Sequence, residues 1–217
     1  MLEKLLEELR PAGARLVAVS KTHPPEQILE LYNRGQRIFG ENKVQELVPK
    51  YEALPKDIEW HLIGHLQTNK VKYVAPFVTC IESVDSLKLL QEIDKQAKRY
   101  GRTIDCLLQF HIAEEETKFG LNIEEAAELL QSPAFQQLEN IRITGVMGMA
   151  TFTDDPVQVR REFRSLKAVF DKLKSTYFPQ IAYYKEISMG MSGDYPIAIE
   201  EGSTLVRIGT LLFGERV

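Results

Sequence analysis

Short apolar runs rich in valine, isoleucine and phenylalanine alternate along the chain with longer segments that have helical spacing. Each run is nearly continuous in apolar content, without clean alternation between apolar and polar positions. That pattern is typical of parallel strands buried on both faces of a sheet. We count eight such runs, at residues 15–21, 38–42, 59–66, 78–84, 105–112, 143–150, 186–192 and 205–214.

Seven segments between these runs are predicted to be helices. Several begin with a capping residue, a proline or acidic residues in the first turn, as at Pro24-Pro25, Asn122 and Asp155-Pro156. A further amphipathic helix is predicted over residues 1–10, where leucines and charged residues are interleaved. The seven segments cover residues 24–33, 43–53, 68–74, 86–100, 123–131, 156–177 and 195–201.

Eight strands with intervening helices predict an α/β fold, a single (β/α)8 TIM-type barrel with an extra N-terminal helix. An open doubly wound sheet is the alternative, but such sheets usually contain about five or six parallel strands. The chain has 217 residues and no linker-like tract, which suits one barrel of ~200–250 residues. We therefore expect residues 1–217 to form one domain.

Composition narrows the classes of function. The net charge of −4 disfavours nucleic-acid binding, which usually requires a basic excess. No apolar run approaches the ~20 residues of a membrane span, and the N-terminal segment lacks the apolar core of a signal peptide. Cys80 and Cys106 lie in apolar runs and are expected to be buried and reduced. We expect a cytoplasmic protein with no nucleic-acid or membrane partner.

Chemistry in such a barrel is expected where the strands end and the following loops begin. Lys21 ends an otherwise apolar strand and shares a face with Val17 and Val19 by the two-residue period of a strand. Desolvation lowers the pKa of a lysine and makes it a Schiff-base nucleophile. The alternative is that Lys21 extends its amine to solvent at the rim.

Two glycine-containing segments follow the seventh and eighth runs. Residues 188–194 (SMGMSGD) and Gly209-Thr210 could expose backbone N–H groups to an anion. A phosphate held by the loops after strands seven and eight is a recurrent barrel feature, although either segment could be an ordinary turn.

Arg207 lies inside an apolar run and needs a partner because a guanidinium does not lose its proton. The partner could be an internal acid such as Glu41 or Glu82, or an acceptor atom of a ligand. His61 and His65 are four residues apart, ~13 Å on a straight strand, so no metal site is predicted from them.

Several motifs resemble the YggS/PROSC family of pyridoxal phosphate homeostasis proteins, in order and over nearly the whole chain. The resemblance rests on residues 18–22 (AVSKT), 39–42 (FGEN), 44–46 (VQE), 60–70 (WHLIGHLQTNK), 116–120 (ETKFG), 188–195 (SMGMSGDY) and 198–210 (AIEEGSTLVRIGT). It implies a barrel similar to the N-terminal domain of alanine racemase that binds pyridoxal 5′-phosphate (PLP) in vitamin B6 homeostasis.

The resemblance also implies roles for individual residues. Lys21 would form the Schiff base, Asn42 would lie beside the pyridine ring, Arg207 would face the pyridine nitrogen and Met147 would pack on the ring. The phosphate would be held by Ser188, Ser192, Gly193, Gly209 and Thr210.

We expect binding without turnover, because an arginine at the pyridine nitrogen weakens the ring as an electron sink. A racemase of this architecture also takes a second base from an extra β-domain, and the given sequence ends directly after the eighth run. A monomer that passes PLP to PLP-dependent apo-enzymes is expected. The alternatives are a stand-alone PLP-dependent amino-acid racemase and a cofactor-free Schiff-base lyase using Lys21.

Overall fold

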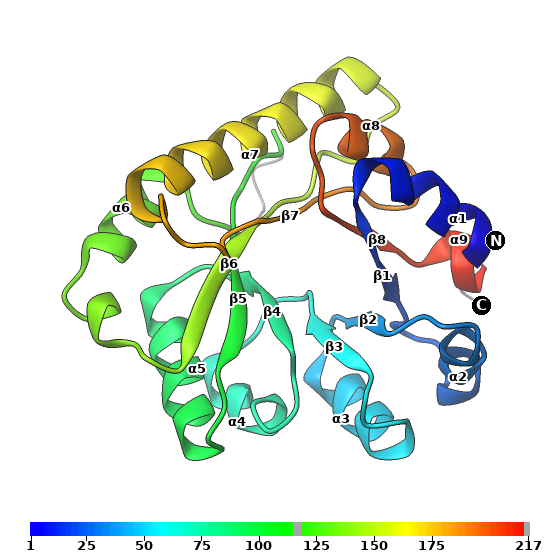
Figure 1. Cartoon of the computed structure of the whole chain (residues 1–217), viewed down its shortest axis with the longest axis horizontal. Coiled ribbons are helices and arrows are strands. Elements are labelled where there is room, and N and C mark those ends of the chain that lie inside the picture. Colours follow the sequence, from blue (N-terminus) through cyan, green and yellow to red (C-terminus); the bar gives the residue numbers. More distant parts are fainter. Residues whose placement is uncertain (115–118, 215–217) are drawn as a thin grey trace.

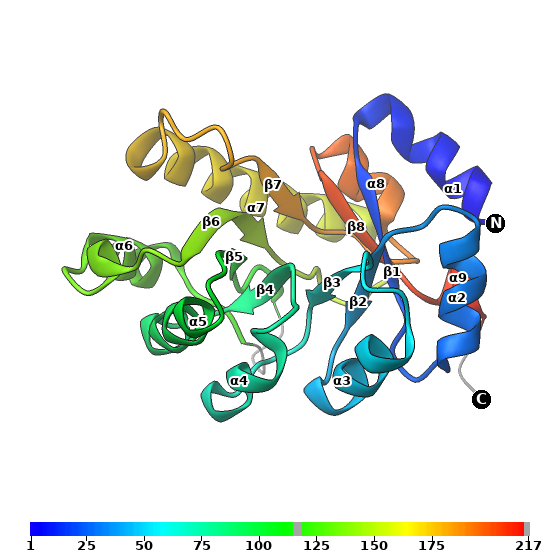
Figure 2. The same ribbon diagram turned by 60° about the horizontal axis from the view of Figure 1, so that its bottom comes forward.

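Eight parallel strands form a closed barrel in the computed structural model, with helices around its outside (Figures 1 and 2). The structure describes residues 1–114 and 119–214, and these residues form eight strands and nine α-helices. Each strand pairs in parallel with the next, and β8 pairs with β1. The strands are β1 (Arg15–Val19), β2 (Ile38–Glu41), β3 (Glu59–Leu62), β4 (Cys80–Val84), β5 (Ile104–Gln109), β6 (Ile141–Met147), β7 (Glu186–Ser188) and β8 (Leu205–Ile208).

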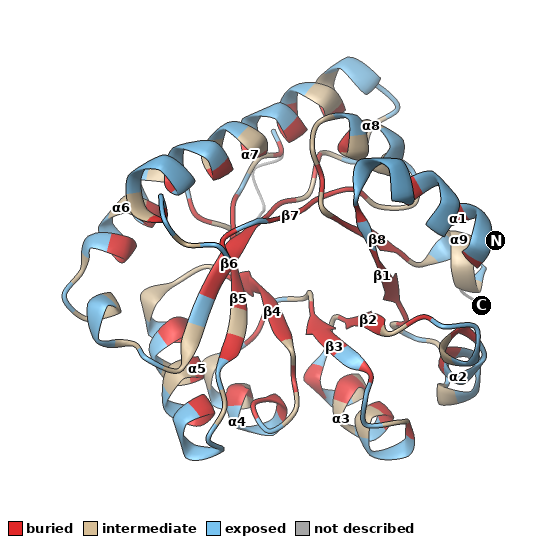
Figure 3. Ribbon diagram, viewed as in Figure 1, coloured by how far each residue is buried: buried red, intermediate tan, exposed pale blue. Residues whose placement is uncertain are grey.

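The helices alternate with the strands along the chain, and their buried residues face the sheet while their exposed residues face outward (Figure 3). They are α1 (Leu2–Leu9), α2 (Pro25–Asn33), α3 (Val44–Ala53), α4 (Val71–Val74), α5 (Leu87–Arg99), α6 (Ile123–Gln131), α7 (Pro156–Tyr177), α8 (Tyr195–Glu200) and α9 (Thr210–Phe213), with short 3-10 turns at Arg10–Ala12, Thr68–Lys70 and Phe135–Gln137. None of the helices within the described residues is long and apolar enough to cross a membrane.

The predicted barrel with an extra N-terminal helix is confirmed, and the open-sheet alternative is wrong because β8 pairs with β1 from Arg15 to Ala18. Helix α1 lies between α8 and α2, where it buries Leu2, Leu5 and Leu9 (Figure 1). It packs on β1 from the outside of the barrel.

Most predicted runs extend past the observed carboxyl ends of their strands. The largest difference is in the last run, predicted over residues 205–214, because β8 ends at Ile208 and α9 follows. Apolar content alone does not separate a buried strand from a buried helical turn. Leu211 and Leu212 are partly buried against the core, so their apolar character serves helix packing rather than the barrel wall.

The apolar core has two parts. The larger part lies between the strands and the helices, and the smaller fills the inside of the barrel. The inner cluster contains Val17, Ile38, Cys80, Leu107, Met147 and Leu205. Layers of inward side chains are the usual filling of an eight-stranded barrel, which makes the interior a packed core.

Candidate functional site

Lys21 lies at the carboxyl end of β1, where the chain leaves the barrel wall. Val17 belongs to the inner apolar cluster, so the two-residue period places Lys21 on the same inward side. Lys21 is partly buried. The next residue, Thr22, has a φ of 69°, a left-handed conformation that is unfavourable for a β-branched residue. Such strain occurs preferentially at functional sites, and here it adjoins the predicted lysine.

The carboxyl end of β8 lies directly beside that of β1. A Cβ on Gly209 would lie 3.1 Å from the carbonyl oxygen of Val19, so glycine permits this close approach. Gly209 is also the residue before α9, whose first N–H groups have no partner within the helix. Thr210 is exposed. The predicted anion-binding turn after the eighth strand therefore lies next to the end of β1, two residues before Lys21.

The segment after β7 faces the same end of the barrel. Ser192 is partly exposed and Gly193 is exposed, with open space where a Cβ would stand. Asp194 closes this turn, because its carboxylate accepts a hydrogen bond from the Met191 N–H at 2.6 Å. Burial raises the pKa of Asp194, and the hydrogen bond from Met191 and the charge of Arg207 oppose that rise.

Asn42 follows β2 at the same end and is partly buried. A Cβ on Gly64 would lie 2.2 Å from the carbonyl oxygen of Asn42, so the loop after β3 packs directly on the backbone of this residue. That contact holds Asn42 at the mouth of the barrel. Six predicted site residues thus gather at the carboxyl ends of the strands: Lys21, Asn42, Ser192, Gly193, Gly209 and Thr210.

Met147 lies deeper than these residues. It is fully buried in the inner apolar cluster at the end of β6. Met149, two residues further along, is partly buried and packs on the same cluster. Contact of Met147 with a ring stays a prediction.

A chain of polar side chains crosses the inside of the barrel. The Arg207 Nη1 donates to Ser188 Oγ at 2.6 Å, and Ser188 Oγ donates to Glu82 Oε2 at 2.5 Å. The other carboxylate oxygen of Glu82 lies 2.6 Å from His61 Nδ1. The Arg207 Nη2 also donates to the carbonyl oxygen of Gly148 at 3.0 Å. All four side chains are buried, so their charges interact without much screening by water.

Arg207 therefore has an internal partner, and of the two acids considered from the sequence that partner is Glu82, at 4.0 Å. Burial alone would raise the pKa of Glu82, but the hydrogen bond from His61 and the charges of His61 and Arg207 hold it below its usual value. Burial lowers the pKa of Arg207, and Glu82 and Asp194 oppose that change. Ser188 contributes its hydroxyl to this chain, so its contact with a phosphate stays a prediction.

No role was predicted for His61 from the sequence, and Glu82 was predicted only as a possible partner of Arg207. The strand positions of Glu82 and Arg207 could have predicted that their side chains point into the barrel. Glu82 lies two residues after Cys80 on β4, and Arg207 lies two residues after Leu205 on β8, so each shares the inward face with a member of the inner cluster. Polar residues at inward positions of a buried strand indicate a polar layer between the apolar core and the mouth.

An aromatic contact covers another part of the rim. Phe119 stacks on His65 with ring centroids 4.3 Å apart, and His65 Nδ1 lies 3.7 Å from Asp85 Oδ2. Residues 115–118 of the ETKFG motif lie outside the described residues. Within the described ranges no group of three histidine, cysteine or acidic side chains is placed to hold a metal ion.

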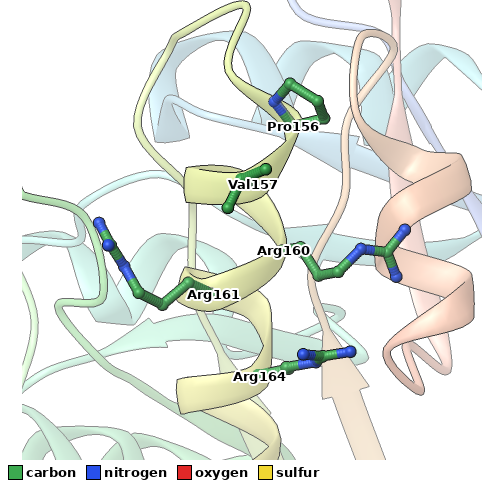
Figure 4. A pocket seen from close by; sticks show the side chains of 5 residues that line it. All are labelled: Pro156, Val157, Arg160, Arg161 and Arg164. Atoms are coloured by element: carbon green, nitrogen blue, oxygen red, sulfur yellow. The ribbon is translucent and has the colours of Figure 1, made fainter.

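A pocket of about 410 Å³ lies on the outer surface of α7 (Figure 4). It is lined by Pro156, Val157, Arg160, Arg161 and Arg164. Each arginine is paired with a carboxylate: Arg160 with Glu200 and Glu201, Arg161 with Glu114, and Arg164 with Glu201. These pairs neutralise the pocket locally, so it offers no excess positive charge to an anion.

The family model of the alanine racemase N-terminal domain matches residues 2–217 of this chain. The chain is 44% identical to a pyridoxal phosphate homeostasis protein from Aquifex aeolicus, over 100% of this chain and 95% of that protein. It is 38% identical to the human protein of the same name, over 93% of this chain and 76% of the relative. The chain belongs to the pyridoxal phosphate homeostasis protein family.

Solved structures agree with this assignment. PipY of Synechococcus elongatus, 37% identical, superposes with a TM-score of 0.90 in a structure without PLP and 0.86 in one with PLP bound, and each match covers 98% of both chains. Alanine racemase from Bartonella henselae superposes with a TM-score of 0.72 at 17% identity, over 99% of this chain and 57% of that one. The racemase therefore shares the barrel fold.

Proposed function

We propose that this protein binds PLP at the carboxyl end of the barrel as a Schiff base on Lys21 and acts in PLP homeostasis. The observation that carries the proposal is the close approach of Gly209, at the start of α9, to Val19, the last residue of β1 and two residues before Lys21. Lys21 would supply the amine, and the neighbouring turn would supply N–H groups for a phosphate. The relatives named as pyridoxal phosphate homeostasis proteins and the PLP-bound structure of PipY support it.

The residues present fit the chemistry of PLP. The Lys21 amine would hold PLP by condensing with its aldehyde, which would form a C=N bond and release one water molecule. The phosphate would lie against Ser192, Gly193, Gly209 and Thr210, whose turns face the mouth. PLP bound in this way would supply a carbon at which another amine can displace the Lys21 amine, so that PLP leaves with that amine.

The remaining predicted residues would hold the ring. Asn42 would lie beside it, and Met147 would support it from below. Arg207 would face the pyridine nitrogen, and its guanidinium would disfavour protonation of that nitrogen. Ser188 would act mainly through Arg207, because its hydroxyl accepts from that guanidinium at 2.6 Å.

We infer that the protein binds PLP without turning over a substrate. A carboxylate at the pyridine nitrogen would favour the protonated ring that acts as an electron sink, whereas Arg207 is held by Glu82 and carries a positive charge. The competing hypothesis is a stand-alone amino-acid racemase. Incubation with a panel of L-amino acids and chiral chromatography separates the two, since a racemase would produce D-enantiomers at a PLP-dependent rate.

The decisive experiment is the visible spectrum of the purified protein with added PLP. We expect a yellow absorbance band that is absent from Lys21→Ala and retained in Lys43→Ala, a matched variant of an exposed lysine near the same end. Borohydride reduction followed by peptide mass spectrometry should place the pyridoxyl group on Lys21. A wild-type protein without a PLP-dependent band would exclude the proposal and the racemase together, and would leave a cofactor-free lyase.

We also propose a cytoplasmic monomer that passes PLP to apo-enzymes. Both cysteines are buried and unbridged, as in a reducing compartment. Transfer predicts that the loaded protein restores activity to a PLP-dependent apo-enzyme faster than the same concentration of free PLP. Sedimentation in the same buffer should give a mass near 24.8 kDa.

A further inference from the structure

A buried polar cluster lies behind Lys21, on the outer side of the barrel wall, and the proposed binding of PLP does not use it directly. Ser20 and Glu41 point outward from the ends of β1 and β2, and Lys50 reaches them from α3. Glu41 and Ser20 are fully buried, and the side chain of Lys50 is only 8% exposed. A buried ion pair of this kind is weak evidence for stability alone, which raises the question of what it holds in place.

The cluster binds the main chain on the N-terminal side of Lys21. The Lys50 ammonium donates to the carbonyl oxygen of Ser20 at 2.8 Å and to Glu41 Oε1 at 2.6 Å. The Ser20 hydroxyl donates to the same oxygen of Glu41 at 2.7 Å. The peptide unit that enters Lys21 is therefore fixed by a side chain from the helix layer.

The same helix binds the main chain on the C-terminal side of Lys21. Glu46 lies one turn before Lys50 on α3, and its Oε2 accepts a hydrogen bond from the Thr22 N–H at 2.8 Å. Lys50 and Glu46 are also within 3.8 Å of each other. Both peptide units that flank Lys21 are thus held by a pair of oppositely charged residues on one face of α3.

The backbone between these two contacts is a tight turn. The His23 N–H donates to the Ser20 carbonyl oxygen at 3.1 Å, so Lys21 and Thr22 are the central residues. A positive φ at the second central residue is typical of turns that prefer glycine or asparagine, and Thr22 has a φ of 69°. A threonine keeps this conformation only where surrounding contacts determine it, and the Glu46 carboxylate supplies such a contact.

We propose that Glu46 and Lys50 are positioning residues for Lys21: they clamp the turn so that the Lys21 amine faces the mouth of the barrel. The proposal rests on the proposed function, because it assigns the clamp to the Schiff-base lysine. It predicts that release of either contact changes how Lys21 reacts with PLP, beyond any change in stability.

The test compares Glu46→Ala with Glu46→Gln, which keeps an oxygen that can accept from the Thr22 N–H. Glu52→Ala is the matched control, since Glu52 is an exposed residue on the same helix. Amide hydrogen exchange at Thr22 is measured by NMR on protein without PLP. The apparent dissociation constant for PLP is then measured from the visible band, with thermal midpoints recorded for every variant.

In Glu46→Ala we expect exchange at Thr22 and the PLP dissociation constant each to rise about tenfold, the equivalent of one hydrogen bond to a charged group. Glu46→Gln should stay within about threefold of wild type, and Glu52→Ala should match it. The double variant Lys50→Met with Glu41→Gln removes the bond to the Ser20 carbonyl without leaving a lone buried charge. It should weaken PLP binding by a similar factor.

An unchanged PLP dissociation constant in Glu46→Ala, with faster exchange at Thr22, would overturn the clamp and leave the proposed function intact. Equal weakening of PLP binding in Glu46→Ala and Glu52→Ala would also overturn the positioning role of Glu46. A PLP-dependent band that is present in wild type and survives in Lys21→Ala would refute the proposed function itself. That result is distinguishable because it does not depend on any variant of α3.

Discussion

Lys50→Met tests the buried pair between α3 and β2. The substitution removes the ammonium that lies 2.6 Å from Glu41 Oε1 and leaves that oxygen with the hydrogen bond from the Ser20 hydroxyl. The other oxygen, Glu41 Oε2, has no hydrogen-bond partner within the described residues. Glu41 is 0% exposed, so water cannot replace the lost contact.

The expected loss follows from the cost of breaking a buried ion pair, about 3–5 kcal/mol of the free energy of unfolding. For a chain of this length each kcal/mol shifts the thermal midpoint by about 2–4 °C, so the midpoint should fall by roughly 6–20 °C. Adding Glu41→Gln to Lys50→Met should recover at least half of that loss, because no buried charge then remains unpaired.

The loss should also depend on pH. Burial raises the pKa of Glu41 above its usual 4.5, although the Lys50 and Ser20 contacts oppose the rise. In Lys50→Met that opposition is weaker, so the folded protein favours the protonated carboxyl more strongly. A raised folded-state pKa gives stability that is present below 4.5 and lost as pH rises through the folded-state value. The deficit of the variant should therefore be small in acid and largest at neutral pH.

Urea denaturation followed by circular dichroism measures the free energy of unfolding of wild type, the single variant and the double variant. Repeating it at neutral pH and near pH 4.5 gives the dependence of the deficit on pH. A deficit below about 1 kcal/mol at neutral pH would refute the reasoning, since it would mean that water or backbone groups compensate Glu41. So would a deficit of equal size at both pH values.

Three further predictions concern the buried charges and a strand glycine of the barrel. Arg207→Glu places a second carboxylate near Glu82 and should cost about 3–5 kcal/mol in urea denaturation, unlike a surface charge reversal. The lowered pKa of Glu82 gives stability that is present above its usual value of 4.5 and is lost as pH falls through the folded-state pKa. The urea midpoint of the wild-type protein should therefore fall as the pH is lowered through that acid range. Gly145→Ala sets a Cβ 1.8 Å from the Glu186 carbonyl oxygen and should lower the free energy of unfolding by more than about 3 kcal/mol. Gly193→Ala is the control: it has open space around its Cβ and should change the free energy of unfolding by less than about 0.5 kcal/mol.

The barrel was predictable from the sequence because its evidence is periodic and local. Each of the eight strands lies within or overlaps one predicted run, and the capping residue Asn122 begins α6 with the full reciprocal pair of hydrogen bonds to Glu125. The strand ends were predicted less well. The run that reaches Gly214 divides into β8 and α9, because apolar side chains pack on a core in either conformation.

The candidate site was predictable as far as it depends on strand ends. In a parallel barrel all carboxyl ends open at one face, so Lys21, Asn42 and Gly209 lie at that face although they are far apart in the sequence. The partners of Arg207 were not fixed in that way. Glu41 and Glu82 were equal candidates, and only the direction of each side chain through the barrel wall separates them.

The sequence by itself determined the order of strands and helices, the position of Lys21 after the first strand and the motifs of the family, because these depend on residue spacing along one chain. The tertiary structure decided which charges meet. Barrel closure brings Arg207 to Glu82 through Ser188, and packing of α3 on the wall brings Lys50 and Glu46 to the turn at Lys21. The strength and partner of a buried charge depend on distance and on exclusion of water, and both arise only when separate elements pack together.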